Sequence, residues 1–413
     1  MTKLRQDANQ IIQQSLHQVL PDAAVKRALE TKTFTEGNVY LVAVGKAAWQ
    51  MAASARQILG KQLHKGIVLT KYGHVSGEIS DVVCYEAGHP VPDTNSFHGT
   101  EAILAMTADL KPEDTVLFLL SGGGSALFEK PLVPEEELAD ITAQLLACGA
   151  NIVEMNTIRK RLSAVKGGKF ALHCAPAKIY SIVLSDIIGD PLDMIASGPA
   201  CQDASTCEQA LSLVKKYHLH ISEAAYHCLQ IETPKKLTNV EAVISGSVRE
   251  LCQAAARECQ KLGYTPTILT DQLECEAREA GSFLAAIAKF HQNTKEPCAF
   301  IAGGETVVHL KGKGKGGRNQ EIALCAALGL DGIENAALFS IGSDGTDGPT
   351  DAAGGYVDGN TKKCLEEKEI DIYQILQENN AYEALHACEG LIITGPTGTN
   401  VNDVTVLLLG ARE

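Results

Sequence analysis

The stretch TVLFLLSGGGSALF, residues 115–128, joins two kinds of secondary structure. Its first half is a nearly continuous apolar run, which is typical of a strand buried on both faces of a sheet. Three glycines interrupt the run, and a helix is expected to open near Ala126. A buried strand that ends in glycine and leads into a helix is the repeating element of proteins with a parallel sheet, so the stretch predicts an α/β fold.

The same arrangement recurs along the chain. Apolar runs that end in glycine or a small polar residue occupy residues 39–59, 180–190 and 242–264, and further runs begin near residues 297, 336 and 390. Their alternation with helical patterns predicts a parallel sheet that helices cover on both faces. Ligands of such sheets bind beyond the carboxyl ends of the strands, which is where the glycine-rich stretches fall.

The length of the chain predicts two domains. Its 413 residues exceed the roughly 250–300 that one hydrophobic core usually supports. A polar segment with a proline, residues 229–241, separates the two series of strands, so we expect domains at residues 1–235 and 236–413. A cleft between the two domains is then the first place to look for a site.

Charge and composition exclude some classes of protein. The formal net charge of −14 argues against a nucleic-acid partner, which would require a broad basic face. The 13 cysteines form no C-x-x-C pair and are expected to be reduced core residues. The first 20 residues carry apolar side chains at helical spacing, and no apolar segment reaches the roughly 18 residues that span a bilayer. We therefore expect a cytoplasmic protein without a membrane partner.

The glycines of residues 121–125 are suited to binding an anion. Consecutive glycines let the backbone approach an anion closely, and the start of the following helix would offer unpaired N–H groups. No Lys-Ser or Lys-Thr follows at the spacing of a P-loop, which excludes that class. The alternative is a tight strand-to-helix turn that binds nothing. Lys46, after Gly45 at the end of another strand, could turn its ammonium into the same crevice, or could simply be solvated.

The stretch GGETVVHLKGKGKGGRNQEIAL, residues 303–324, contains the G-x-G-x-x-G pattern at Gly312, Gly314 and Gly317. A dinucleotide site would also need an acidic residue about 20 residues later at the end of a second strand, and that context is missing. Three lysines and Arg318 lie among the glycines, which favours a polyphosphate ligand. The alternative is a mobile, solvated hairpin tip.

Two acidic loops follow predicted strands. One carries Asp186, Asp190 and Asp193, and the other carries Asp344, Asp347 and Asp351. Carboxylates at strand ends suit Mg²⁺, which prefers one or two of them together with phosphate oxygens and water. Aspartate is equally common in turns and caps, so each residue has that alternative.

A basic segment, residues 155–171, adds further candidates. On a helix, Arg159, Ser163 and Lys166 would share one face and could bind an acidic substrate. A solvated helix face is the alternative. His89 lies in the motif AGHPVPDTNS, where a proline-fixed loop and a catalytic role both remain open.

The chain resembles the glycerate 2-kinase family, whose C-terminal half carries the MOFRL module and whose members are often labelled hydroxypyruvate reductases. The motifs that carry the resemblance span nearly the whole chain in family order: VGKAA, GHPVPD, SGGGSAL, MNTIRKRLSAVKGGKFA, SDIIGDPLDMIASGP, GGRNQEIAL, SIGSDGTDGPTDAAGG and TGPTGTNVNDV. The module's naming motif departs from the family pattern, since GGRNQEIAL stands in its place.

The resemblance implies ATP-dependent phosphorylation of D-glycerate at the 2-hydroxyl, with Mg²⁺. It also implies an N-terminal Rossmann-like parallel-sheet domain and a smaller C-terminal α/β domain of the MOFRL type, with the active site in the cleft between them. The family's essential lysine and arginine map to Lys46 and Arg318. Expected partners are D-glycerate and ATP, and a homodimer stays open.

These observations combine into one assignment of candidate residues. Catalysis is assigned to Lys46, Arg318 and Asp186. The substrate or phosphate is assigned to Ser121, Gly122, Gly123, Gly124, Ser125, Asn156, Arg159 and Lys166. The nucleotide is assigned to Gly303, Gly304, Glu305, Lys313, Lys315, Gly316, Gly317 and Asn319, and the metal to Asp190 and Asp344.

Three alternatives remain at this point. A nicotinamide-dependent hydroxypyruvate reductase would need a dinucleotide site, and a kinase of another small sugar acid would use the same residues. A non-catalytic sensor of sugar acids or nucleotides would keep the basic residues but would need no metal carboxylates.

Overall fold

The computed structural model describes residues 2–34 and 36–412 and divides into two compact units. The parallel-sheet unit is Ala24–Ser245, and the mixed-sheet unit combines the residues up to Ala23 with those from Gly246 onward. The division at 245/246 lies later than the expected 235/236. The first residues also belong with the second half of the chain, because helix α1 (Lys3–Gln18) packs its apolar face against α11 (Val248–Lys261).

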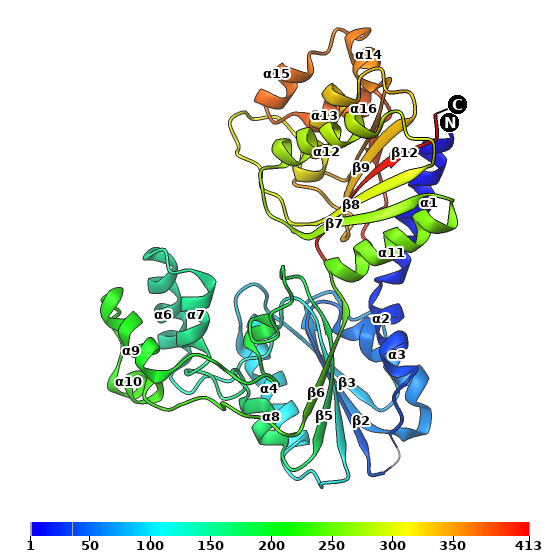
Figure 1. Ribbon diagram of the computed structural model, residues 1–413. Coiled ribbons are helices and arrows are strands. Elements are labelled where there is room, and N and C mark those ends of the chain that lie inside the picture. The colour runs from blue at the N-terminus through cyan, green and yellow to red at the C-terminus, as the bar shows by residue number, and fades with distance from the viewer. Residues whose placement is uncertain (1, 35, 413) are drawn as a thin grey trace. The chain divides into compact units, whose positions relative to one another are not determined.

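The parallel-sheet unit contains a six-stranded sheet in the order β3-β2-β1-β4-β5-β6 (Figure 1). The pairs from β3 through β5 are all parallel, which confirms the predicted sheet. The strands are β1 (Val39–Val44), β2 (Leu63–Lys71), β3 (Val82–Ala87), β4 (Thr115–Leu120), β5 (Lys178–Leu184) and β6 (Val240–Gly246).

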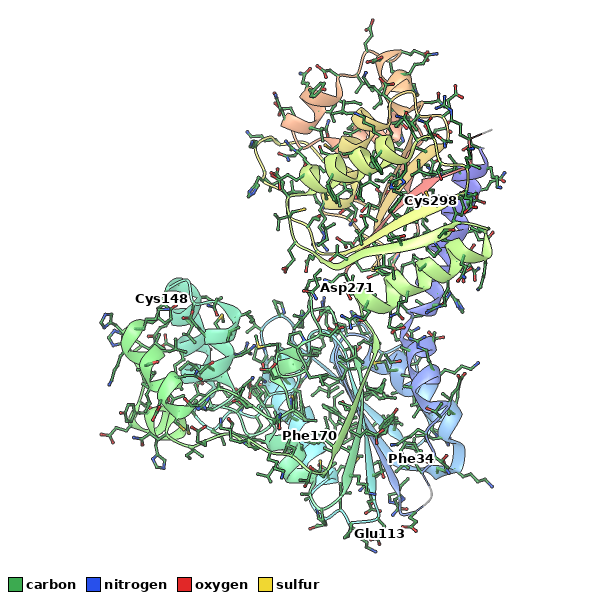
Figure 2. The ribbon with its side chains drawn as sticks, in the orientation of Figure 1. Phe34, Glu113, Cys148, Phe170, Asp271 and Cys298 are labelled. Atoms are coloured by element: carbon green, nitrogen blue, oxygen red, sulfur yellow. The ribbon has the colours of Figure 1, made fainter. Side chains whose placement is uncertain are left out.

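Both faces of this sheet are buried, as the continuous apolar runs predict. Along β4, Phe118 packs on one face and Leu117 on the other, because successive side chains of a strand point to opposite sides. Phe170, labelled in Figure 2, lies with its ring centroid 5.1 Å from those of both Phe118 and Phe128. The helical segments around the sheet are α2 (Pro21–Leu29), α3 (Ala48–Leu59), η1 (Gly60–Gln62), α4 (Thr94–Met106), α5 (Gly124–Leu127), α8 (Lys169–Cys174) and η2 (Ile195–Ser197).

Four more helices of this unit form a small helical cluster with a hydrophobic core of its own. Figure 1 shows them gathered to one side of the sheet. They are α6 (Glu135–Ala147), α7 (Ile152–Arg159), α9 (Cys207–Lys216) and α10 (Glu223–Leu229).

The mixed-sheet unit contains a second six-stranded sheet, in the order β11-β10-β9-β12-β8-β7. The expectation of a parallel sheet is wrong here: only β7 and β8 pair in parallel, while β12 runs antiparallel to both β8 and β9. A strand buried on both faces reads as an apolar run whichever way it points, so the sequence of β12 could not give its direction. The strands are β7 (Thr265–Leu273), β8 (Cys298–Gly304), β9 (Ala336–Gly342), β10 (Gly354–Asp358), β11 (Leu391–Ile392) and β12 (Asp403–Leu409).

Helices cover both faces of the second sheet. Helices α1 and α11 pack on one face, and a larger apolar core fills the other. The helices of that core are α12 (Ala277–His291), α13 (Arg318–Leu330), α14 (Thr361–Glu366), α15 (Ile372–Gln377) and α16 (Ala381–Ala387). In the part of the chain that the structure describes, every helix is too short or too polar to serve as a membrane span.

Candidate active site

In the parallel-sheet unit, the glycine-rich loop and Lys46 are joined by backbone hydrogen bonds. Strands β1 and β4 are neighbours, so their carboxyl ends lie side by side. The Lys46 amide donates to Gly122 O over 2.9 Å, and the Ala47 amide donates to Ser121 Oγ over 3.1 Å. Two motifs that lie far apart in sequence therefore form one surface.

The glycines allow three candidate side chains to approach this loop. A Cβ on Gly122 would lie 2.2 Å from Asp186 Oδ2. A Cβ on Gly123, which has a left-handed φ of 89°, would lie 3.0 Å from His89 Cδ2 and 3.3 Å from Lys46 Cγ. Burial, and then the positive charge of Lys46, lower the pKa of His89. The structure thus brings Lys46, His89 and Asp186 together around the loop.

The helix after the loop is short. It begins at Gly124, two residues before the expected start near Ala126, and is the single turn α5. Because the field of a helix dipole grows with aligned peptide units, one turn contributes little to anion binding. Binding would depend on the exposed loop and on nearby cations.

Arg159 supplies one such cation. Its Nη2 donates to Ser125 O over 3.3 Å, and its Nε is buried without a hydrogen-bond partner. Among the ion pairs of the described residues, none involves Arg159. A partly buried guanidinium that lacks a carboxylate partner is suited to an anionic ligand.

Asn156 and Lys166 are buried behind the loop. Asn156 accepts a hydrogen bond from Ser197 Oγ over 2.9 Å, and Ser197 Oγ lies 3.2 Å from Ser125 Oγ. Lys166 Nζ lies 2.7 Å from Glu129 Oε2, and burial lowers the pKa of Lys166 to about 8 although Glu129 opposes the shift. Both side chains support the loop from within the protein, so contact with a substrate would require them to move.

The loop after β5 has an unusual backbone. Asp190, Ala196 and Ser197 all have left-handed φ angles, of 54°, 50° and 62°, which side chains with a Cβ rarely adopt. Asp190 Oδ1 is buried without a hydrogen-bond partner. An oxygen in that position fits a cation, so Asp190 is compatible with a role in holding Mg²⁺.

In the mixed-sheet unit, the lysine- and glycine-rich loop is fixed by the turn between α15 and α16. Asn379 Oδ1 accepts from the amides of Lys311 and Gly312, over 2.7 and 3.0 Å. The Lys315 amide donates to Asn380 Oδ1, and the Lys315 ammonium lies 3.8 Å from the centre of the Tyr382 ring. These amides are therefore already paired within the protein.

Asp347 caps the helix that follows this loop. Its carboxylate accepts from the amides of Asn319 and Gln320, over 3.1 and 2.9 Å, and burial raises the pKa of this carboxyl against those hydrogen bonds. An internal anion thus occupies the N-terminus of α13, where a dinucleotide would place its pyrophosphate. The sequence also lacks the acidic residue that would bind the ribose of a dinucleotide. The geometry and the sequence therefore agree in not supporting a nicotinamide site.

Arg318, the first residue of α13, lies between two carboxylates. Its Nε and Nη2 donate to Asp403 over 2.5 and 3.1 Å, and its Nη1 donates to Glu305 Oε1 over 2.7 Å. Burial alone would lower the pKa of Arg318, but the hydrogen bonds and charges of Asp403 and Glu305 raise it. The guanidinium is therefore charged and firmly oriented.

A cavity of about 730 Å³ opens beside Arg318, which is large enough for a small-molecule ligand. Thr306 Oγ1, buried without a hydrogen-bond partner, lies in its lining. By contrast, Gly303 and Gly304 end β8 against α11 and β7 and do not line the cavity, and Asn319 is fully buried. Other lining residues are Lys313, Gly316, Gly317, Asp344, Thr346 and Asp347.

The three aspartates of the second acidic loop have different surroundings. Asp344 lines the cavity, where its Oδ1 accepts from the Thr346 amide over 2.9 Å. Asp347 caps α13, and Asp351 accepts from Tyr382 OH. Over residues 2–34 and 36–412, no three His, Cys, Asp or Glu side chains converge as a metal site. A single carboxylate with phosphate oxygens and water is, however, an ordinary arrangement for Mg²⁺.

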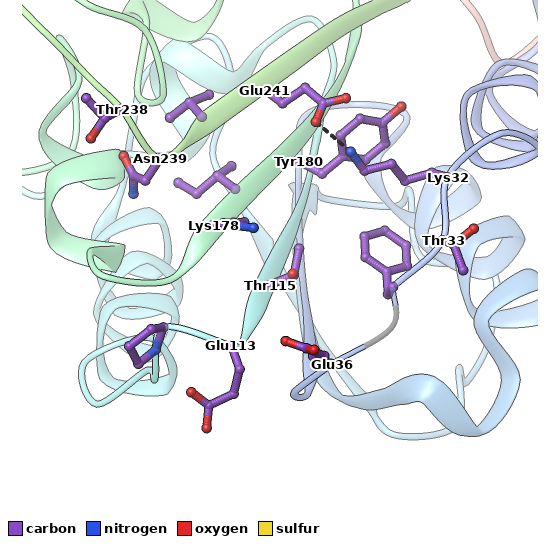
Figure 3. Close-up of a pocket in the computed structure, with 14 residues that line it drawn as sticks. Lys32, Thr33, Glu36, Glu113, Thr115, Lys178, Tyr180, Thr238, Asn239 and Glu241 are labelled. Atoms are coloured by element: carbon purple, nitrogen blue, oxygen red, sulfur yellow. Dashed lines mark hydrogen bonds and ion pairs between the residues drawn. The ribbon is translucent and has the colours of Figure 1, made fainter.

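A second cavity, of about 400 Å³, lies at the opposite edge of the parallel sheet (Figure 3). Its lining includes Thr115 and Lys178, the first residues of β4 and β5. Figure 3 shows Lys32 paired with Glu241 beside Tyr180. Because this cavity lies at the amino ends of the strands, it is separate from the candidate site.

Sequence reasoning gave no role to Asp403 or Thr306, and it considered Asp347 only as a metal ligand or a turn residue, not as the cap of α13. Asp403 and Asp347 fall within the quoted motifs TGPTGTNVNDV and SIGSDGTDGPTDAAGG, so a signal was present, but nothing in the sequence paired either residue with α13. For Thr306 we find no signal in the sequence beyond its position after Gly304.

Comparisons with known proteins agree with these observations. The family model described as "Domain of unknown function (DUF4147)" matches residues 7–230, and that of the MOFRL family matches residues 298–403. A D-glycerate 2-kinase of Thermotoga maritima is 52% identical over 412 residues, or 98% of each chain. A glycerate 2-kinase of Pyrococcus horikoshii is 42% identical, over 92% of this chain and 89% of that protein.

Comparison with solved structures also gives a match over nearly the whole chain. A crystal structure of glycerate kinase from T. maritima matches with a TM-score of 0.94 at 51% identity, and covers 98% of this chain and 99% of that one. A protein of Agrobacterium vitis, provisionally named a hydroxypyruvate reductase, is 38% identical over 91% of this chain and all of that protein.

Proposed function

The chain belongs to the glycerate 2-kinase family, and from that premise we propose that it phosphorylates D-glycerate at the 2-hydroxyl with ATP. The observation that carries the proposal is the meeting of Lys46, Asp186 and the glycine-rich loop at the carboxyl ends of β1, β4 and β5. Phosphoryl transfer depends mainly on positioning and on neutralising charge, and this surface supplies a cation, a carboxylate and close backbone approach.

The glycerate carboxylate is assigned to Arg159 and the loop from Ser121 to Ser125. Arg159 has an unpaired Nε beside Ser125, and a planar guanidinium can hold a carboxylate by two hydrogen bonds. With the acid fixed there, the 2-hydroxyl would face Asp186. Asn156 and Lys166 keep the loop in shape from behind.

The nucleotide is assigned to the cavity beside Arg318, whose lining includes Lys313, Gly316 and Gly317. In the transfer, the 2-hydroxyl oxygen forms a bond to the γ-phosphorus as the bond from the γ-phosphorus to the bridging oxygen of ADP breaks. The hydroxyl proton passes to Asp186. Lys46 and Arg318 are the cations assigned to the transferring phosphoryl group, whose negative charge they would stabilise.

Mg²⁺ is assigned to Asp190 and Asp344. Asp190 offers an unpartnered oxygen and Asp344 faces the cavity, so both fit the ion. When bound, Mg²⁺ would neutralise charge on the β- and γ-phosphates. Lys46, Arg318 and Asp186 position and deprotonate the reactants.

An NMR-resolved assay with D-glycerate, ATP and Mg²⁺ tests the proposal. We expect 2-phosphoglycerate, lost on chelation of the metal, while hydroxypyruvate with NADH or NADPH should stay unchanged. L-Glycerate and larger sugar acids run in parallel define the acceptor. Nicotinamide oxidation without phosphorylation of D-glycerate would overturn the proposal.

A further inference from the structure

The negative charge around Arg318 is unexpected for a residue that is proposed to bind a phosphate group. One guanidinium faces two carboxylates, Asp403 and Glu305, so the three groups carry a net negative charge when both carboxylates are ionised. Burial raises the pKa of Asp403 to about 7, and the hydrogen bonds and charge of Arg318 oppose that shift. A polyphosphate approaching this site would be repelled unless one carboxylate left the guanidinium.

The two carboxylates hold Arg318 in different ways. Asp403 accepts hydrogen bonds from Nε and Nη2, which lie along one edge of the guanidinium. Its side chain is 8% exposed, and as the first residue of β12 it is paired on both sides by β8 and β9. Asp403 is therefore a permanent partner that orients the guanidinium.

Glu305 contacts only the outer nitrogen, Nη1, and its side chain is 47% exposed. Its second oxygen accepts from Asn402 Nδ2 over 3.1 Å. Asn402 itself has a left-handed φ of 63°, a conformation that asparagine adopts more readily than most residues. Glu305 is thus held by two contacts at a half-exposed side chain that follows directly after β8 and precedes Thr306 of the cavity lining.

Nη1 is also where an arriving phosphate would bind. Asp403 takes the N–H of Nε and one N–H of Nη2, so Nη1 is the nitrogen that Asp403 leaves entirely to other partners, and Arg318 lines the 730 Å³ cavity. A carboxylate oxygen 2.7 Å from Nη1 imitates a phosphate oxygen in charge and distance.

We propose that Glu305 is an internal substitute for phosphate: it occupies Arg318 Nη1 in the resting protein, and the phosphate of the nucleotide must displace it. The inference rests on the proposed nucleotide site. It changes the expected role of Glu305 from a direct contact with the nucleotide to a competitor that lowers nucleotide affinity. Glu305 is then a positioning residue that keeps Arg318 oriented while the site is empty.

The test is isothermal titration calorimetry with a non-hydrolysable ATP analogue and Mg²⁺. Glu305→Gln keeps the shape but removes the charge, so we expect binding about twofold to fivefold tighter, as is appropriate to a half-exposed ion pair. Glu305→Asp, whose shorter side chain reaches Nη1 poorly, should also bind more tightly. Glu334→Gln, which removes a carboxylate from an exposed loop of the same unit, should leave affinity unchanged.

The outcomes separate the two proposals. If the unmodified protein binds no nucleotide, the proposed function fails. If it binds, and Glu305→Gln binds equally or more weakly, Glu305 does not compete with phosphate and the inference fails. Thermal melting of each variant checks that the fold is intact, which is expected because Glu305 is half-exposed.

Discussion

Lys160 Nζ lies 3.1 Å from Asp203 Oδ1, and both side chains are almost completely buried. The same ammonium lies 3.2 Å from Asp193 Oδ2 on the acidic loop. Lys160, at the end of α7, therefore connects that loop to the buried carboxylate of Asp203. Thr233 and Ser205 donate to the other oxygen of Asp203, which satisfies the remaining lone pairs.

We expect Lys160→Met to destabilise the protein by about 3 kcal/mol, because it leaves Asp203 buried without its closest cation. Denaturation by urea measures the effect. Lys32→Met is the matched control, since it breaks a more exposed pair with Glu241 and should cost about 0–1 kcal/mol. Equal losses in the two variants would contradict the account of the buried pair.

Arg318→Lys should lower turnover by about two powers of ten or more. Arg318 donates to Asp403 from two nitrogens and has a third for phosphate. The ammonium of lysine has only one nitrogen, so it cannot keep both hydrogen bonds to Asp403 and also bind phosphate in the same way. Arg318→Ala should cost at least as much in turnover, and should also destabilise the fold because Asp403 loses its partner. Arg249→Lys, at a more exposed pair with Asp271, serves as the control. Turnover within about threefold of the unmodified enzyme would rule out a catalytic role for Arg318.

Arg159→Gln should raise the KM for glycerate about tenfold to a hundredfold, because it removes a charged partner of the substrate carboxylate. The KM for ATP should change little. Steady-state kinetics with each substrate varied in turn gives both values. Lys178→Gln removes a cation from the opposite edge of the sheet and should alter neither. A larger change in the KM for ATP would place the nucleotide, and not the acid, at the glycine-rich loop.

Stability should fall in mild acid because of His89. Burial and Lys46 lower the pKa of His89, so the folded protein takes up this proton less readily than the unfolded chain. The contribution of neutral His89 is present above about pH 6.5 and is lost as the pH falls through the lower value of the folded state. Melting temperatures across this range measure it. His89→Gln should reduce the slope while the exposed control His98→Gln should not, and identical slopes would contradict the prediction.

The sequence was informative where local pattern determines structure. The apolar runs and the glycines after them predicted the strands of the parallel sheet, and Lys46 and residues 121–125 were expected at their carboxyl ends because parallel strands end at one edge. The turn that each glycine permits is a property of the glycine itself, so its sequence signal is strong.

The sequence was uninformative where partners come from distant segments. The Lys311 amide donates to Asn379 Oδ1, 68 residues further along the chain, and no local sequence pattern predicts that hydrogen bond. Likewise, Asp344 and Asp347 look equivalent in the sequence and both line the cavity, but only Asp347 caps α13. Which aspartate remains available to a ligand was decided by tertiary packing.

The division of the chain also has a consequence for biosynthesis. The residues up to Ala23 belong with those from Gly246 onward, so the parallel-sheet unit is an insertion within the mixed-sheet unit. During translation, α1 leaves the ribosome first, but its partner α11 follows only after the whole inserted unit has been made. The apolar side chains of Ala8, Ile11 and Ile12 must therefore stay exposed, or pack against other segments, until α11 emerges.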